Sequence, residues 1–121
     1  MSGTILRFFV HEAERHGGEL LFEWLLEEAR RLGVPGGSAF RAIAGYGRHG
    51  VLHEQTFFEL AGQLPVQVVF VTSTEHADRL LARLSEHGVR LFYALSEARF
   101  GVTGVAGGRV QGGRVQGEGD Q

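Results

Sequence analysis

The sequence contains no cysteine and no lysine, and each absence narrows its chemistry. Without cysteine the chain has no disulfide, no thiol nucleophile and no thiolate metal ligand. Without lysine every fixed positive side chain is an arginine, whose planar guanidinium carries donors suited to phosphate and carboxylate. The formal net charge of −2 also argues against a general nucleic-acid binder, because such a protein needs a basic face.

Long hydrophobic runs are missing too. The longest apolar stretch, around residues 66–71, is far too short to cross a bilayer. Arg7 interrupts the apolar residues of the N-terminus and acidic residues follow them, so we expect no signal peptide. The chain has 121 residues, of which 43% are hydrophobic and 21% charged, as is typical of one soluble domain. We therefore predict a cytoplasmic protein that is not embedded in a membrane.

Hydrophobic periodicity predicts two helices among several strands. Helices are expected at 19–33 and 73–88, and strands at 4–10, 38–45, 56–61, 66–71 and 89–95, with a short extra strand at 96–102. We interpret the order as β-α-β-β-α-β, in which two β-α-β units share an antiparallel sheet and both helices lie on one side. The predicted fold class is therefore α+β, with the ferredoxin-like layout.

Phenylalanines are spread over the predicted strands, and only one parity of each strand can face the helices. The other aromatic side chains would leave an apolar patch on the open face of the sheet. Such a patch usually marks an interface, so we expect the protein to associate with itself.

The composition changes near the C-terminus. Residues 101–121 hold eight of the nineteen glycines, and the pentapeptide GGRVQ occurs at 107–111 and again at 112–116. This segment has little apolar surface to bury. We predict one domain over residues 1–102 and a flexible tail over 103–121.

The stretch GYGRHGVLH, residues 45–53, contains Gly45, Gly47 and Gly50 at the spacing of a dinucleotide-binding turn. That turn has to join a strand to a helix, so that the helix N-terminus meets the pyrophosphate. Residues 51–60 are instead rich in β-branched and aromatic side chains and show no helical stripe. The context therefore argues against a Rossmann site.

His49 and His53 have the i, i+4 spacing of two ligands on one helical face, but the neighbouring glycines oppose a helix here. In an extended chain the two positions lie roughly 13 Å apart. A shared metal ion would need a loop that folds back or a second copy of the chain.

A glycine-rich loop between strands can bind an anion through successive backbone N–H groups. Arg48 adds positive charge to this loop, and a histidine that titrates near neutral pH would make binding pH-sensitive. We find no catalytic triad and no pair of catalytic carboxylates, and therefore expect no enzymatic activity.

The turn and the strand after it resemble a known family. The matching residues are Gly45, Gly47, Gly50 and His53, followed by Leu64, Pro65 and Val66. This pairing of a GxGxxGxxH turn with a later LPV is similar to the PII-like family catalogued as domain of unknown function 190. The resemblance covers about residues 4–95, and the tail lies outside it.

The resemblance implies a ferredoxin-like homotrimer built around the open sheet faces, related to the PII signalling proteins of nitrogen regulation. In those relatives adenyl nucleotides bind in clefts between subunits, and the loop after the second strand contacts partner proteins. Carried over to this chain, it implies no firm cofactor and a small ligand such as an adenyl nucleotide. A membrane transporter or an enzyme is the expected partner of the 45–53 loop. The implied ligand-binding residues are Arg41, Gly45, Gly47, Arg48, His49, Gly50 and His53.

Two alternatives stay open. One is a trimer that binds a divalent metal through His49 and His53, and the other is an adaptor that acts without a ligand. The chain also departs from the family, which commonly has acidic residues where Gln63 and Thr72 stand, and glycine in place of Ala42.

Overall fold

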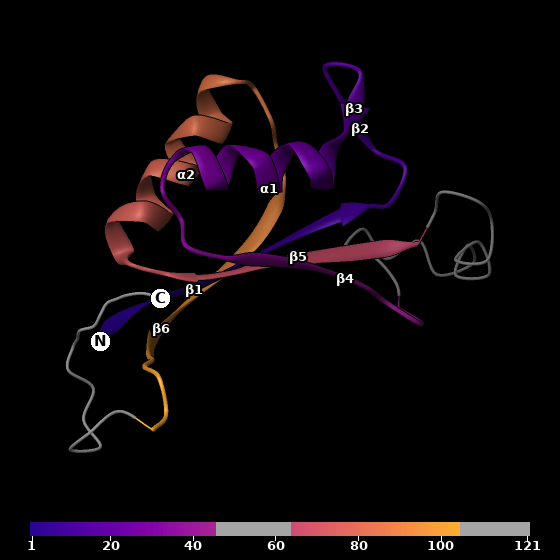
Figure 1. Cartoon of the computed structure of the whole chain (residues 1–121). Helices are drawn as coiled ribbons and strands as arrows, with labels where there is room; N and C mark the ends of the chain where they lie inside the picture. The colour runs from indigo at the N-terminus through magenta and orange to yellow at the C-terminus, as the bar shows by residue number, and fades with distance from the viewer. Residues whose placement is uncertain (46–63, 105–121) are drawn as a thin grey trace.

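The computed structural model of this chain describes residues 1–45 and 64–104. Within these ranges it contains a four-stranded sheet, a two-stranded hairpin and two helices that lie on the same side of the sheet (Figure 1). The elements are β1 (Ser2–His11), β2 (Arg15–His16), β3 (Glu19–Leu20), α1 (Leu21–Arg31), β4 (Gly37–Arg41), β5 (Pro65–Thr72), α2 (Thr74–Glu86) and β6 (Phe92–Arg99).

The strand order of the large sheet is β4-β5-β1-β6, and every neighbouring pair is antiparallel. Helix α1 connects β1 to β4, which lie on either side of β5, and α2 connects β5 to β6, which lie on either side of β1. These two interleaved β-α-β units are the predicted ferredoxin-like layout, which the structure confirms.

Several element boundaries differ from the prediction. The first helix begins at Leu21 and not at residue 19, because residues 15–20 form the β2–β3 hairpin. Strand β4 ends at Arg41, four residues before the predicted end at Gly45. The expected strand at 56–61 lies outside the described residues, as does the tail from residue 105 onward.

The extra strand predicted at 96–102 is wrong, because β6 runs without a break from Phe92 to Arg99 along β1. The apolar pattern changes parity within this strand because apolar side chains lie on both of its faces. Tyr93 and Leu95 pair with residues of β1 that face the helices, whereas Phe92 pairs with Phe9 on the open face. The change of parity therefore does not mark the end of a strand.

The core lies between the helices and one face of the sheet. Strict alternation on β1 and β5 places every second side chain in it. Its largest fully buried members include Phe8, Phe70, Leu6, Leu25 and Leu80. The rings of Phe8 and Phe70 meet edge to face, with their centroids 6.2 Å apart.

Gly37 allows β4 to lie directly against β5. It pairs with Phe70, and a Cβ at position 37 would overlap the ring of that phenylalanine. The absence of a side chain here lets β4 enter the sheet in this register, and the register determines where Arg41 lies at the other end of the strand.

Truncation of a core residue of α2 should destabilise the fold. Leu80 is 1% exposed, so Leu80→Ala should lower the free energy of unfolding by about 2–5 kcal/mol through lost burial and a residual cavity. The neighbouring Arg79 is exposed, and Arg79→Ala should change it by less than about 0.5 kcal/mol. Urea denaturation followed by circular dichroism measures both, and equal effects of the two variants would contradict this account of the core.

Candidate functional site

The structure describes Arg41 and Gly45 among the predicted ligand-binding residues. The others, Gly47, Arg48, His49, Gly50 and His53, lie outside the described residues, so their part in a site stays a prediction. The geometry of the candidate site is therefore built from Arg41 and the elements around it.

Arg41 is the last residue of β4 and lies beside the start of β5. It pairs with Val66 in the sheet, and the Ala42 N–H donates to the carbonyl of Pro65 at 2.9 Å. On the other side of β5, the Glu12 N–H donates to the carbonyl of Leu64 at 2.8 Å. The first residues of β5 are thus held between the end of β1 and the end of β4.

This arrangement brings Glu12 and Arg41 together although 29 positions separate them in the chain. The Arg41 Nη2 donates to Glu12 Oε2, and the side chains are 59% and 27% exposed respectively. Mainly through this hydrogen bond, Arg41 lowers the pKa of the Glu12 carboxyl, and Glu12 raises the pKa of Arg41. Both groups are therefore charged at neutral pH.

The other ion pairs in the part of the chain that the structure describes involve α1. Glu27 pairs with Arg30 and Arg31 on the same helix, and the buried Glu28 pairs with Arg31 at 2.9 Å and with Arg83 of α2 at 3.7 Å. Those pairs support helices. The pair of Glu12 and Arg41 instead connects the residue after β1 with the last residue of β4.

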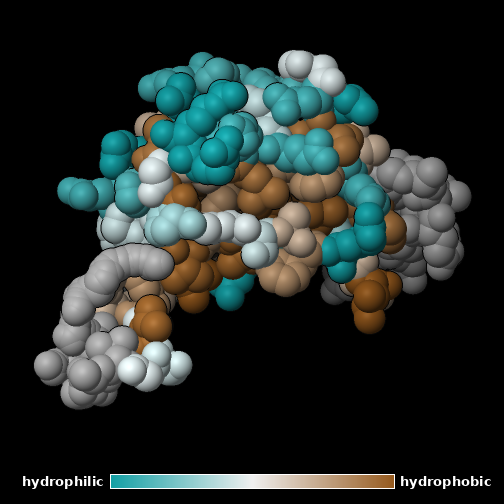
Figure 2. All heavy atoms as spheres, viewed as in Figure 1, coloured by the Kyte–Doolittle hydropathy of each residue, from teal (hydrophilic) through white to brown (hydrophobic). Residues whose placement is uncertain are grey.

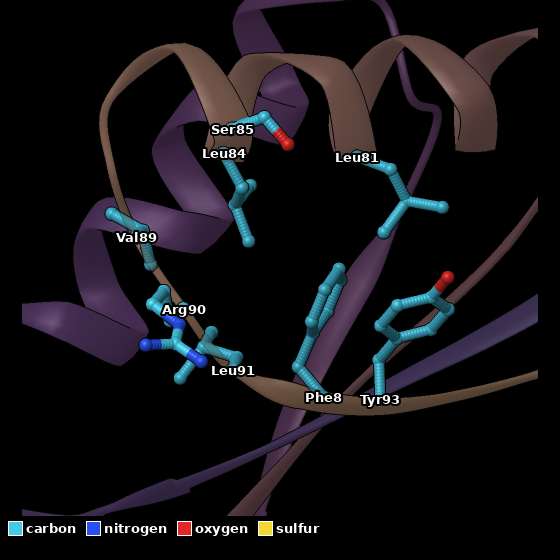
Figure 3. A pocket seen from close by; sticks show the side chains of 8 residues that line it. All are labelled: Phe8, Leu81, Leu84, Ser85, Val89, Arg90, Leu91 and Tyr93. Atoms are coloured by element: carbon cyan, nitrogen blue, oxygen red, sulfur yellow. The ribbon is translucent and has the colours of Figure 1, made fainter.

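A cavity of about 280 Å³ lies between α2 and β6 (Figure 3). By strand register it lies at the same end of the sheet as Arg41. Leu81 and Leu84 point into it from the helix, opposite the rings of Phe8 and Tyr93. Arg90 also lines the cavity, and it forms no ion pair with any residue that the structure describes. The cavity therefore combines apolar walls with a cation that has no ionic partner in the described ranges.

Arg90 is a candidate residue that sequence reasoning missed. A signal for it exists: Arg90 follows the glycine after α2 by two positions, and it is the one charged residue in the otherwise apolar stretch 89–95. The apolar pattern of this stretch predicts a strand throughout. In the structure β6 begins at Phe92, and Arg90 lies in the connection before it.

Arg41 and Arg90 lie at the same end of the sheet but beside opposite edges. Arg41 belongs to the edge strand β4, and Arg90 precedes the other edge strand, β6. Two strands separate these edges, which places them about 14 Å apart at about 4.8 Å per strand. The two arginines therefore start from opposite edges of the sheet, and each edge could also meet a second copy of the chain.

The sheet face opposite the helices carries exposed aromatic side chains. Phe9, Phe40 and Phe92 are 38%, 55% and 47% exposed, and Val71 is 41% exposed. Strand register places all four on this face, and the rings of Phe9 and Phe92 lie 5.4 Å apart. Figure 2 shows the contrast, with hydrophilic residues over the outer side of the helices and hydrophobic residues along the sheet.

Neither metal binding nor membrane insertion gains support from the described ranges. Residues 1–45 and 64–104 contain no cluster of three or more His, Cys, Asp or Glu side chains that could hold a metal ion. Neither α1 nor α2 is long and apolar enough to span a membrane.

Solved structures show which class of fold this is. A PII-like signalling protein of Thermus thermophilus superposes with a TM-score of 0.54 and 21% identity, covering 81% of this chain and 87% of its own. CPII, a nitrogen regulatory PII-like protein of Thiomonas intermedia bound to ADP, AMP and bicarbonate, superposes with a TM-score of 0.58 and 14% identity, covering 84% and 96%. The fold is PII-like.

Sequence comparison then gives the family. The chain belongs to DUF190, described as "Uncharacterized ACR, COG1993", whose family model matches residues 3–99. The UPF0166 protein of Aquifex aeolicus is 36% identical over 80 residues, which are 66% of this chain and 76% of that protein. The UPF0166 protein of Methanocaldococcus jannaschii is 33% identical over 86 residues, 71% and 79% of the two chains. The predicted family is confirmed.

The ion pair of Glu12 and Arg41 predicts an acid-shifted carboxyl group. Because the pKa of Glu12 is lowered on folding, the pair stabilises the protein above the unfolded pKa, and this contribution is lost as the pH falls through the folded pKa. In Arg41→Gln the Glu12 pKa should return upward toward its ordinary value, whereas Arg79→Gln should leave it unchanged. Carbon-detected NMR titration of the glutamate carboxyls measures this, and an unshifted Glu12 in the wild type would contradict the pairing.

Proposed function

We propose that this protein is a non-enzymatic, PII-like regulatory protein that binds an adenyl nucleotide in clefts between copies of the chain. The observation that carries the proposal is the position of Arg41, an exposed cation at the edge of the sheet and shortly before residues 46–63. The GxGxxGxxH turn at 45–53 supports it, because glycine-rich backbone and Arg48 suit a phosphate group. CPII, which has the same fold, is described as bound to ADP and AMP.

We place this cleft between two chains, because the two described arginines that suit a phosphate lie beside opposite edges of the sheet and each edge can meet another copy. In an assembly that brings the β4 edge of one copy toward the β6 edge of the next, Arg41 and Arg90 would approach the same ligand. The apolar walls of the cavity beside Arg90 would suit a flat base or a ribose, and the guanidinium groups the phosphates.

The open sheet face supports self-association, and we propose a homotrimer formed through it. Phe40, Phe9 and Phe92 lie in one row across this face, near the end of the sheet where β5 begins, and Val71 lies farther along β5. Exposed aromatic clusters of this kind are costly for a monomer in water and are typical of interface centres. The 45–53 loop is the proposed contact for a transporter or an enzyme partner.

Nucleotide binding is tested by isothermal titration calorimetry with ATP, ADP and AMP. At least one should bind the wild type, and Arg48→Ala and Arg90→Ala should each weaken binding roughly tenfold or more, because a charge-assisted hydrogen bond is lost. Arg30→Ala is the matched control, because it removes an exposed arginine of α1 that lies near Gly37, at the opposite end of β4 from Arg41. Absence of binding by all three nucleotides would refute the proposal.

Assembly is tested by sedimentation equilibrium of the purified chain. The wild type should have three times the 13.2 kDa mass of one chain. Phe9→Glu places a charge among the aromatic residues of the open face and should reduce the mass toward that of a monomer. Glu75 lies in the exposed first turn of α2, so Glu75→Gln should leave the mass unchanged. A monomeric wild type would contradict the interface.

A further inference from the structure

We propose that Glu12 is an internal competitor for the anion that Arg41 binds, so that an anion has to displace this carboxylate to reach all the donors of Arg41. The inference rests on the proposed function for the identity of the ligand. The chemistry itself depends only on Glu12 and Arg41, both of which the structure describes.

Arg41 is accessible but already neutralised. A guanidinium has five N–H donors, and Arg41 uses Nη2 for Glu12. Its Nε and Nη1 have no hydrogen-bond partner within residues 1–45 and 64–104, and the side chain is 59% exposed. An arriving phosphate therefore finds free donors, but it finds them next to a carboxylate that accepts from the same group.

The carboxylate is held there by the backbone on both sides of β5. Glu12 is anchored through its N–H to the carbonyl of Leu64, and the residue after Arg41 is anchored through its N–H to the carbonyl of Pro65. Leu64 and Pro65 are consecutive residues. The backbone next to Glu12 and Arg41 is therefore fixed on the two sides of β5, and the two charged side chains extend across this strand. Forming a surface ion pair usually costs side-chain entropy. Here the fixed backbone already limits the arrangements of the two side chains, so this entropy cost is smaller.

The pair makes the site discriminate by charge. A neutral ligand does not interact with the charge of Glu12, whereas each additional negative charge on a ligand near Arg41 is repelled by it. A phosphate reaches the full donor set only if the carboxylate leaves Arg41, and a group with several charges competes better for the guanidinium than a carboxylate does. Glu12 therefore lowers the affinity for anions relative to what Arg41 alone would give, and it leaves the affinity for an uncharged ligand unchanged.

Calorimetry on the wild type and its variants tests this, with ADP, pyrophosphate and the uncharged adenosine as probes. Glu12→Gln should tighten the binding of ADP and pyrophosphate by about threefold to tenfold over the wild type and leave adenosine unchanged. Glu12→Gln combined with Arg41→Gln should lose this gain. Glu27→Gln is the matched control, because it removes one carboxylate that pairs with an exposed arginine, Arg30, on α1. It changes the net charge equally and should not affect binding.

The outcomes separate the two proposals. If ADP binds and Glu12→Gln leaves its affinity unchanged or weakens it, the competitor role is overturned, since Glu12 then only positions Arg41. An equal gain in Glu27→Gln also overturns it, because the effect is then one of net charge. If ADP binds none of the proteins, the proposed function fails, and pyrophosphate decides the inference separately: a gain in Glu12→Gln that requires Arg41 supports it, and no gain overturns it. Circular dichroism establishes that each variant is folded.

Discussion

The pairing of β5 between β1 and β4 is the constraint on which the candidate site depends. Antiparallel ladders on both sides of this strand align the end of β1, the start of β5 and the end of β4. Glu12 is the residue after β1, and Arg41 is the last residue of β4. Because these two strands lie on either side of β5, the two side chains meet across it. A shift of one residue in the β4–β5 ladder would move Arg41 to the other face of the sheet, and a shift in the β1–β5 ladder would displace Glu12, so either shift would separate the pair. Gly37, which fits against Phe70, helps to set this register.

The same strands present two faces with different roles. On β1, Leu6 and Phe8 are buried under the helices, whereas Phe9 lies on the open face. Apolar residues on both parities are usual for a strand that is covered on both sides. In the chain alone only one side is covered, so the alternation that defines the core also creates the surface that a second copy would cover.

The sequence allowed much of the fold to be predicted, because the signals involved are local. The helices show apolar stripes at helical spacing, and β1 and β5 show alternation that matches their burial. The hairpin β2–β3 was not predicted, because two strands of two residues each carry no period that a pattern could reveal. The break assumed near residue 96 was wrong because parity alone does not report where a ladder ends.

The candidate site was less predictable, for a physical reason. Arg41 was identified through its place before a glycine-rich turn, but its pairing with Glu12 joins residues 29 positions apart, and no local pattern encodes such a contact. The sequence pattern does not indicate Arg90, because the apolar residues around it predict a strand. In the structure Arg90 precedes β6 and lines a cavity. Both features follow from tertiary structure: strand order for the first, and the packing of α2 against β6 for the second.

Strand order also connects assembly to ligand binding. Because Arg41 and Arg90 lie beside opposite edges of one sheet, the proposed cleft that uses both arginines forms where the β4 edge of one copy meets the β6 edge of the next. A ligand that binds the assembled form and not the separate chain stabilises that assembly by mass action. Under the proposed function the carboxylate of Glu12 opposes the ligand at one side of this cleft, so it weakens the stabilisation at low nucleotide concentration. The ion pair would then set the ligand concentration at which nucleotide binding begins to strengthen the contacts between chains.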